Sequence, residues 1–186
     1  MSIRIISGEF KGRKLQSIPG KKVRPTSDRT REAIFNILAH DVEGAFVLDL
    51  FAGTGAFGIE ALSRGAEYAV FVDIDKDAIR ALRSNVQGMP VAHRTKVIQW
   101  DLTKNLNCLC SPQYRFNLVF MDPPYSKNMI TPPLLHLLES HSLEPGACLI
   151  IEHSALEPIP EIKMPLKLND QRRYGKTLVS FLNYVL

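Results

Sequence analysis

The 186-residue sequence lacks the residue patterns of a metalloprotein. Of its three cysteines, Cys108 and Cys110 are two positions apart and Cys148 is distant, which matches no zinc-binding spacing. The five histidines are scattered, and His136 and His141 lie five positions apart, whereas residues four apart share a helical face. We therefore expect reduced, partly buried thiols and no metal site.

Long apolar runs are missing as well. No stretch approaches the about 20 apolar residues that a membrane-spanning helix needs, and the N-terminus lacks the apolar region of a signal peptide. The sequence is 45% hydrophobic and 23% charged, which is ordinary for a folded soluble domain. We expect a single domain over residues 1–186, with no membrane association and a cytoplasmic location.

Acidic residues are scarce in the first part of the chain. Residues 1–31 contain only Glu9 and Asp28 against nine lysines and arginines, a balance of +7, which leaves −3 for the rest of a chain of net charge +4. Charge concentrated in this way favours a polyanionic partner, nucleic acid above all, over a surface that is merely solvated. We expect residues 1–31 to form a basic extension and residues 32–186 to form the core. The basic residues are Arg4, Lys11, Arg13, Lys14, Lys21, Lys22, Arg24, Arg29 and Arg31.

A strand, a glycine turn and a helix follow one another in residues 47–66. The apolar run of residues 47–50 predicts a short buried strand, followed by Gly53-Thr54-Gly55 and then by apolar residues at helical spacing. Glycine brings backbone N–H groups close to a ligand, because it tolerates positive φ and has no Cβ. With Gly58 the stretch also fits G-x-G-x-x-G, so it predicts a nucleoside-like ligand without deciding which one.

Strands and helices alternate along the rest of the chain. We therefore expect a mainly parallel, doubly wound α/β sheet, in which the closely spaced last strands form an antiparallel hairpin. The predicted strands are residues 69–73, 97–100, 116–121, 147–151, 167–168 and 177–185, and helices are predicted at residues 75–88 and around 134–138.

One more helix is predicted before the central strand. Thr26 or Ser27 can cap its N-terminus. Arg29 and Arg31 would lie in its first turn, where the helix dipole disfavours cations, and this placement hints at anion binding. Its buried face is expected to hold Ala33, Ile34, Ile37 and Leu38.

Four aspartates fall at or near the carboxyl ends of predicted strands, the edge where α/β sheets bind ligands. They are Asp49, Asp73, Asp101 and Asp122. Asp73 follows Gly53 by twenty residues, where an acidic side chain accepts the hydroxyls of a ribose. Asp101 can accept from an adenine amine, although a plain turn role fits almost equally well. Ile74 and Leu102 would flank the base, or would simply belong to the core.

The turn Asp122-Pro123-Pro124-Tyr125 ends the predicted strand 116–121. Two prolines fix successive φ angles, so the Asp122 carboxylate and a main-chain carbonyl can point the same way. Two fixed acceptors would hold both hydrogens of a planar NH2 group and expose its lone pair, while Tyr125 offers an aromatic face to a base. The turn favours amine chemistry on a nucleobase over hydride transfer.

These motifs resemble those of the class I S-adenosylmethionine-dependent methyltransferases that modify exocyclic amines. Over nearly its whole length the chain is similar to the bacterial 16S rRNA (guanine-N2)-methyltransferase family, the RsmD type, and the N-terminal Arg-Pro-Thr block narrows the resemblance to this family. The residues that carry it, besides Asp122-Pro123-Pro124-Tyr125, are Arg4-Ile5-Ile6-Ser7-Gly8, Lys11-Gly12-Arg13-Lys14-Leu15, Arg24-Pro25-Thr26, Asp28-Arg29, Arg31-Glu32, Asp49-Leu50-Phe51-Ala52-Gly53-Thr54-Gly55 and Arg173-Tyr174-Gly175.

The resemblance implies a Rossmann-like class I methyltransferase fold, with a mainly parallel seven-stranded sheet, an antiparallel last strand and helices on both faces. It implies S-adenosyl-L-methionine as cofactor and 16S rRNA, or the small ribosomal subunit, as partner; we expect a monomer. The implied cofactor residues are Asp49, Phe51, Gly53, Gly55, Asp73, Ile74, Asp101 and Leu102. The target guanine would be held by Asp122, Pro123, Pro124 and Tyr125, and the RNA by Arg4, Lys11, Arg13, Lys14, Arg24, Arg29 and Arg31.

Three alternatives stay open from the sequence. Asp122 stands where many amine methyltransferases have Asn and suits adenine N6 as well as guanine N2, so a DNA adenine-N6 methyltransferase remains, although no separate DNA-recognition domain is evident. A non-catalytic RNA-binding or ribosome-assembly module would explain the basic extension but not the two intact motifs. An NAD-dependent oxidoreductase would explain only the glycine turn.

Overall fold

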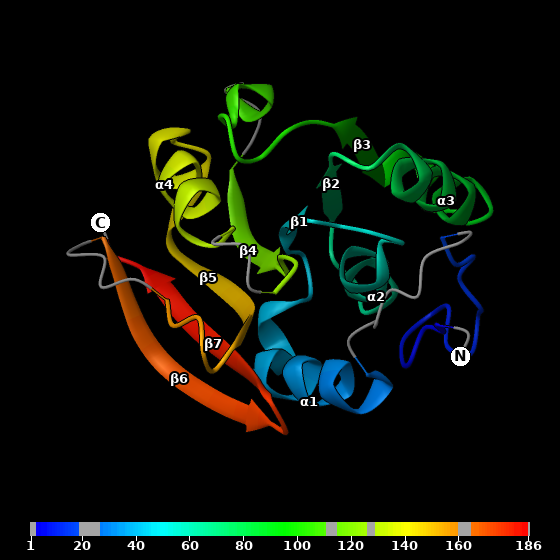
Figure 1. Cartoon of the computed structure of the whole chain (residues 1–186). Helices are drawn as coiled ribbons and strands as arrows, with labels where there is room; N and C mark the ends of the chain where they lie inside the picture. The colour runs from blue at the N-terminus through cyan, green and yellow to red at the C-terminus, as the bar shows by residue number, and fades with distance from the viewer. Residues whose placement is uncertain (1–2, 19–26, 111–114, 126–128, 160–164, 186) are drawn as a thin grey trace.

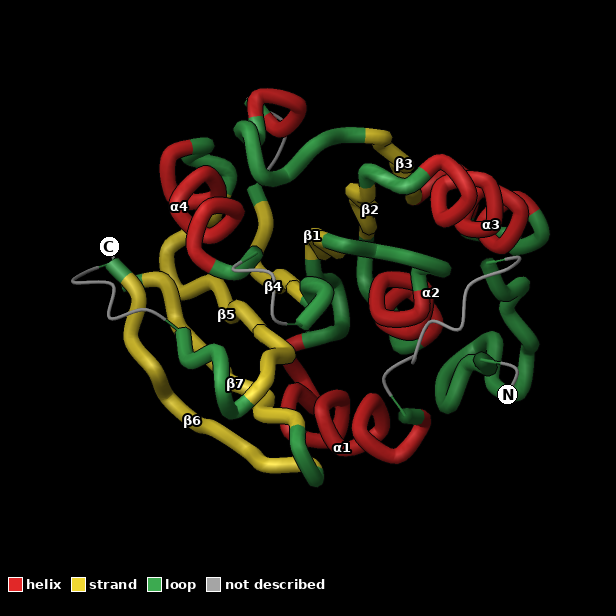
Figure 2. Tube along the Cα trace, viewed as in Figure 1, coloured by secondary structure: helices red, strands yellow, loops and turns green. Residues whose placement is uncertain are grey.

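A computed structural model describes residues 3–18, 27–110, 115–125, 129–159 and 165–185. Within these ranges the chain forms a seven-stranded sheet with helices on both faces (Figures 1 and 2). The strands are β1 (Phe46–Leu50), β2 (Tyr68–Asp73), β3 (Thr95–Gln99), β4 (Phe116–Met121), β5 (Leu143–Ser154), β6 (Leu166–Tyr174) and β7 (Thr177–Tyr184). The helices are α1 (Asp28–Leu38), α2 (Ala56–Ser63), α3 (Lys76–Gln87) and α4 (Thr131–Glu139), with the short 3-10 turns η1 (Ala39–Asp41), η2 (Ala92–Arg94) and η3 (Asn107–Leu109).

The strand order is β3-β2-β1-β4-β5-β7-β6. The five strands from β3 to β5 are parallel, and β7 runs antiparallel to both β5 and β6. The predicted fold is confirmed, including the antiparallel hairpin at the end of the chain. β5 begins at Leu143, earlier than the predicted strand, and β6 continues to Tyr174, six residues beyond the predicted strand at 167–168; the other boundaries shift by a few residues at most.

The sheet separates two hydrophobic cores, one on each face. Because successive residues of a strand point to opposite faces, Val47 belongs to one core and Leu48 to the other. Residues of α1, α2 and α3 complete the first core, and residues of α4 and η3 complete the second. This two-sided burial is the reason that the central strands are apolar along nearly their whole length.

Helix α1 presents a different face to the core than predicted. Ile34 and Leu38 are buried as expected, but Ile37 is 41% exposed and Phe35, which the prediction omitted, is buried. The Phe35 ring lies 5.4 Å from that of Phe120 in β4, so the aromatic contact sets the rotation of the helix. Ser27 is the N-cap, and its Oγ accepts from the Thr30 backbone N–H at 3.0 Å.

Residues 3–18 form the N-terminal hairpin, which the structure docks against α2 and α3 (Figure 1). The buried Glu60 carboxylate of α2 accepts from the backbone N–H groups of Ile6 at 2.7 Å and Ser7 at 3.0 Å. Ser63 Oγ, also in α2, accepts from the Phe10 N–H at 2.9 Å. The expected boundary at residue 31 falls inside α1, so the core begins before that residue.

Several expected features lie outside the described residues. These are the Thr26 cap and the basic residues Lys21, Lys22 and Arg24. In the described part of the chain, no helix combines the length and apolar character that crossing a membrane requires. The same described ranges contain no group of three or more His, Cys, Asp or Glu side chains suited to a metal ion.

Candidate active site

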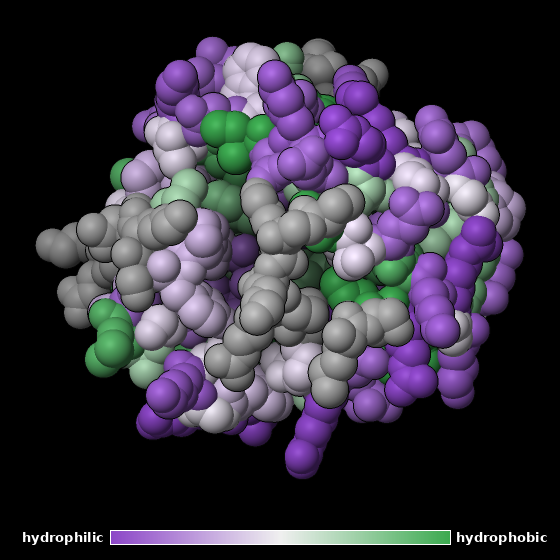
Figure 3. Space-filling model, turned by 45° about the vertical axis from the view of Figure 1, so that its right-hand side comes forward, coloured by the Kyte–Doolittle hydropathy of each residue, from purple (hydrophilic) through white to green (hydrophobic). Residues whose placement is uncertain are grey.

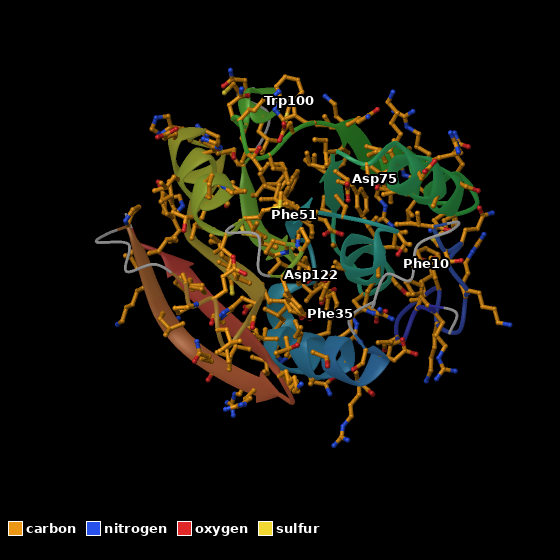
Figure 4. The ribbon with its side chains drawn as sticks, viewed as in Figure 1. Phe10, Phe35, Phe51, Asp75, Trp100 and Asp122 are labelled. Atoms are coloured by element: carbon orange, nitrogen blue, oxygen red, sulfur yellow. The ribbon has the colours of Figure 1, made fainter. Side chains whose placement is uncertain are left out.

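The predicted site residues of three neighbouring strands meet at the carboxyl edge of the sheet. Leu50 of β1 pairs with Val72 of β2 and with Met121 of β4, so the next residues of these strands lie level with one another. Those residues are Phe51, Asp73 and Asp122. Figure 4 places Phe51 and Asp122 together near the ends of β1 and β4. The register therefore brings the glycine turn and the Asp-Pro-Pro-Tyr turn to the same edge of the sheet.

Residues 51–55, the glycine turn, depart sharply from ordinary backbone geometry. Phe51, Gly53 and Gly55 all have positive φ, of 59°, 55° and 82°. For Phe51 this conformation is strained, because its side chain crowds the neighbouring carbonyl. A strained residue such as Phe51, next to two glycines with positive φ, is typical of a ligand-binding turn that the surrounding fold holds in place.

The glycines of this turn serve different purposes. A Cβ on Gly53 would meet only the Phe51 carbonyl oxygen, at 3.9 Å, so the space beside it is open to a ligand. A Cβ on Gly55 would come within 2.3 Å of Leu82 Cδ1 in α3, and one on Gly58 would come within 2.3 Å of the Phe71 ring in β2. Gly53 leaves room at the surface, whereas Gly55 and Gly58 allow α2 to pack closely on its neighbours.

Asp73 at the end of β2 ties the two adjoining loops together. Its Oδ2 accepts from the Gly53 N–H at 2.8 Å, and its Oδ1 accepts from the Asp75 N–H at 2.9 Å. Asp75 in turn caps α3, as predicted, by accepting from the N–H groups of Asp77 and Ala78. A carboxylate oxygen can accept more than one hydrogen bond, so supporting the turn does not by itself prevent Asp73 from accepting from a ligand.

Asp49 is a buried carboxyl group at this edge. It is buried in β1 and accepts from the Gly58 N–H at 2.9 Å. Burial raises the pKa of Asp49 well above its usual value; the Gly58 hydrogen bond opposes the shift, and the nearby charges of Asp122 and Asp73 add to it. Asp73 and Asp122 therefore lie close enough to Asp49 to act on it, and three acidic side chains gather around the glycine turn.

Three residues were predicted to hold an adenine ring, and they differ in whether a ligand can reach them. Ile74 is 53% exposed beside Asp73, so its side chain is accessible to a ligand. Asp101 forms a turn, with Oδ1 accepting from the Thr103 N–H and hydroxyl at 3.1 and 2.7 Å, and these bonds lower its pKa. Leu102 is only 3% exposed and belongs to the second core, so the prediction that its side chain flanks a base is wrong.

Residues 122–125 form the second half of the site, the acidic corner. Pro123 is buried and anchors the corner, whereas Pro124 is exposed. The Tyr125 hydroxyl donates to Glu152 Oε1 at 2.7 Å and lies 3.0 Å from Thr177 Oγ1. Burial of the hydroxyl is the main cause that raises the pKa of Tyr125, and the Glu152 carboxylate adds to the shift. The corner is thus fastened to β5 and β7.

Of the predicted RNA-binding residues that are described, one is misplaced. Arg31 is 1% exposed, donates to the Arg4 carbonyl and to Asp28 Oδ1 at 2.5 and 3.1 Å, and has Nε 4.0 Å from the Glu60 carboxylate. It is a buried structural cation, and the prediction that it binds RNA is wrong. The others are exposed, namely Arg4, Lys11, Arg13, Lys14 and Arg29; Arg4 pairs with Asp28, and Arg13 donates to the Gly88 carbonyl.

The exposed basic residues lie on the side of the molecule that carries the N-terminal hairpin and α3. In Figure 3 this side comes forward, and hydrophilic residues cover much of its right-hand part.

Asn85 of α3 connects this side to the glycine turn. Its side-chain amide accepts from the Gln16 N–H at 2.7 Å and donates to the Thr54 carbonyl at 3.0 Å.

Sequence reasoning missed the side chains that support the site. Glu152 follows an apolar strand, like the aspartates that were selected, so the same strand-end rule was enough to find it. Thr177, Glu60 and Asn85 carry no comparable signal, because their partners are 52, 54 and 69 residues away along the chain.

The strand order, the glycine turn after β1, the acidic residue after β2 and the Asp-Pro-Pro-Tyr corner after β4 together define a class I methyltransferase fold. The family model described as Conserved hypothetical protein 95 matches residues 3–183. The chain belongs to this family, and the resemblance to the RsmD type is confirmed.

Three further comparisons agree. Ribosomal RNA small subunit methyltransferase D of Haemophilus influenzae is 35% identical, over 84% of this chain and 81% of that protein. The solved structure of Escherichia coli yhhF has a TM-score of 0.87 at 29% identity and covers 100% of this chain and 99% of that one. An RNA methyltransferase of Salinibacter ruber, solved with S-adenosyl-L-homocysteine, shares the fold at 19% identity, with a TM-score of 0.65 over 87% of this chain and 94% of that one.

Proposed function

We propose that this protein transfers a methyl group from S-adenosyl-L-methionine to the exocyclic N2 amine of a guanine in 16S rRNA of the small ribosomal subunit. One observation carries the proposal: the strand register places the glycine turn and the Asp122 carboxylate level with each other at one sheet edge. Family membership and the name of the Haemophilus influenzae relative support the choice of ribosomal RNA.

The residues around the glycine turn fit the cofactor. S-adenosyl-L-methionine supplies an electrophilic methyl group on a sulfonium and carries a net positive charge, which suits the carboxyl groups of Asp73 and Asp122 beside the glycine turn. The open space beside Gly53 admits the methionine part, and Asp73 would accept from the ribose hydroxyls. Exposed Ile74 would cover one face of the adenine.

The acidic corner would hold the target amine. Asp122 would accept a hydrogen bond from the NH2 group and stabilise the positive charge that develops on nitrogen, while a carbonyl of Pro123 or Pro124 would accept a hydrogen bond from the second hydrogen. The N–CH3 bond would form as the sulfonium S–CH3 bond breaks, and the methylated nitrogen would then lose one proton. The main contribution of the protein is then alignment of the nitrogen with the methyl group, an effect worth about 7–11 kcal/mol in well-oriented reactions. A base stacked within a helix cannot reach the corner, so the guanine must be unpaired or flipped.

The experiment is radiolabelled methyl transfer to small-subunit particles and to free 16S rRNA, followed by nucleoside analysis. We expect N2-methylguanine with wild-type protein, and loss of transfer with Asp122→Ala while calorimetry still detects cofactor binding. The matched control is Asp77→Ala, which removes a half-exposed aspartate from the first turn of α3. Normal turnover by Asp122→Ala would contradict the proposal.

The same assay with DNA as a further substrate, together with the calorimetry, separates the other functions. Methyl transfer to adenine in DNA would support the adenine-N6 hypothesis, because Asp122 accepts equally well from either amine. Cofactor binding absent from the wild-type protein would support a non-catalytic RNA-binding module. We propose that phosphates flanking the target are held by the exposed basic residues of the N-terminal hairpin, by Arg29, and by Arg24, which lies outside the described residues. This role applies both to an rRNA methyltransferase and to a non-catalytic RNA-binding module.

A further inference from the structure

We infer that Glu152 and Thr177 are positioning residues of this active site: they hold the phenol oxygen of Tyr125 and so fix its ring as the platform for the target base. The inference rests on the proposed function and extends it to two strands that contribute no residue to either sequence motif. Tyr125 follows β4, Glu152 lies in β5 and Thr177 begins β7.

The register of β4 and β5 supports a shared site. Met121 pairs with Ile151, so Asp122 and Glu152, the next residues, lie level on adjacent parallel strands. The Tyr125 side chain returns from the end of the corner to reach this same position. Three side chains of one edge thus converge: the Asp122 carboxylate proposed to meet the amine, the Glu152 carboxylate, and the Tyr125 phenol that donates to Glu152.

The two ends of the Tyr125 side chain have opposite environments. The hydroxyl is fastened by Glu152 at 2.7 Å and Thr177 at 3.0 Å, whereas Tyr125 as a whole remains 39% exposed. Glu152 is only 7% exposed, and a hydroxyl bound to a buried carboxylate makes a short, strong hydrogen bond. A ring anchored at its oxygen and open on its surface suits stacking against a base.

Anchoring matters because residues 122–125 leave the sheet as a loop. The prolines fix φ at two positions but leave the tyrosine ring free to rotate about its own side-chain bonds. Hydrogen bonds from the Tyr125 hydroxyl to Glu152 of β5 and Thr177 of β7 restrict that rotation before the base binds. The expected benefit is in the rate of the chemical step, because misplacement by about 1 Å can cost about a hundredfold in rate.

The first arm of the test measures methyl transfer by a double-mutant cycle of Tyr125→Phe and Glu152→Ala. Each single variant should lower kcat by roughly tenfold to a hundredfold with little change in cofactor affinity. Because Glu152 acts through the hydroxyl, the double variant should lose no more than the worse single variant. Unchanged kcat for Glu152→Ala, or losses that multiply, would overturn the inference.

Conservative variants guard against misfolding of Glu152→Ala. Glu152→Gln keeps an acceptor at the same place and should retain most of the methyl-transfer activity. Thr177→Ser, which keeps the hydroxyl, should retain more activity than Thr177→Val. Thr95→Val is the matched control, since it removes a hydroxyl that donates to the Ala92 carbonyl at the far end of β3. It should leave kcat unchanged.

The second arm needs no RNA and separates this inference from the proposed function. Protein labelled with 3-fluorotyrosine gives a fluorine signal for each of its five tyrosines, and Tyr125→Phe identifies one of them. Glu152→Ala and Thr177→Val should both shift that signal, and Thr95→Val should not. If the Tyr125 fluorine signal has the same chemical shift in both variants as in the wild-type protein, the inference is overturned. If the signal shifts but the protein methylates no guanine, only the proposed substrate is overturned.

Discussion

The two halves of the candidate site are built in different ways. The glycine turn takes its shape from its own backbone, with positive φ at Phe51, Gly53 and Gly55, and its principal partner Asp73 is the next strand end in the chain. The acidic corner is stiffened by two prolines but oriented by side chains of β5 and β7. The cofactor half is thus mainly local in origin, and the base half depends on distant segments.

The halves also differ in their neighbours. Asn85 links the glycine turn to the N-terminal hairpin, so the part of the molecule that carries the exposed basic residues is joined to the cofactor half. The acidic corner is joined instead to the C-terminal strands. Substitutions can therefore weaken one half and leave the other intact, and the following predictions run from the largest expected effect to the smallest.

Gly55→Ala should disable the cofactor half most strongly. The new methyl group would lie 2.3 Å from Leu82 Cδ1, and φ of +82° strains any residue with a Cβ. Overpacking and left-handed strain together should lower the free energy of unfolding by about 2–5 kcal/mol, measured by urea denaturation. Gly53→Ala is the control, because only strain applies there, at about 1–2 kcal/mol. Equal losses at the two positions would show that packing against α3 is unimportant.

Asn85→Leu should loosen the hairpin and the glycine turn together. The substitution leaves the buried Thr54 carbonyl and the Gln16 N–H without their side-chain partner, which costs about 1–3 kcal/mol of unfolding free energy. Calorimetry should detect weaker binding of S-adenosyl-L-homocysteine, and the Tyr125 fluorine signal should stay unchanged. Ser84→Ala, at the preceding position of α3, should alter neither quantity; a shifted Tyr125 signal in Asn85→Leu would mean that the halves are not independent.

Asp49 makes the stability of the cofactor half depend on pH. A carboxyl group whose folded pKa is raised contributes most stability below its unfolded pKa of about 4, and this contribution is lost as pH rises through the folded pKa. Asn at this position does not titrate and can still accept from the Gly58 N–H. Urea midpoints of Asp49→Asn should therefore rise relative to wild type as pH increases from 4 to 8. A constant difference across this range would argue against a raised pKa.

Arg29 and Arg31 offer the smallest and cleanest comparison. Arg29 is exposed, so Arg29→Gln should change stability by no more than about 0.5 kcal/mol. If Arg29 contacts one phosphate, the slope of log affinity against log salt for the RNA should become shallower by about 0.7. Arg31→Gln should instead lower stability, because Arg31 is buried against Asp28 and Glu60. Salt titrations and urea curves of the two variants should give opposite patterns.

Much of this molecule was predictable from local sequence signals. The alternation of apolar strands and helices, the positive-φ glycines and the Asp75 cap act within a few residues, so they identify the sheet, the turn and the start of α3. The rule that ligands bind at strand ends then located Asp73 and Asp122 on one edge. Leu102 and Ile37 were misjudged because apolar character does not state which side of a segment faces the core.

The sequence by itself determined the order of the elements and the two motifs, because strand periodicity, glycine conformation and proline geometry are properties of adjacent residues. The tertiary structure alone decided that Arg31 is buried rather than available to RNA, that Asn85 joins the hairpin to the glycine turn, and that Glu152 and Thr177 grip Tyr125. Burial and side-chain partners arise when segments far apart in the chain pack together, and no local pattern encodes that outcome.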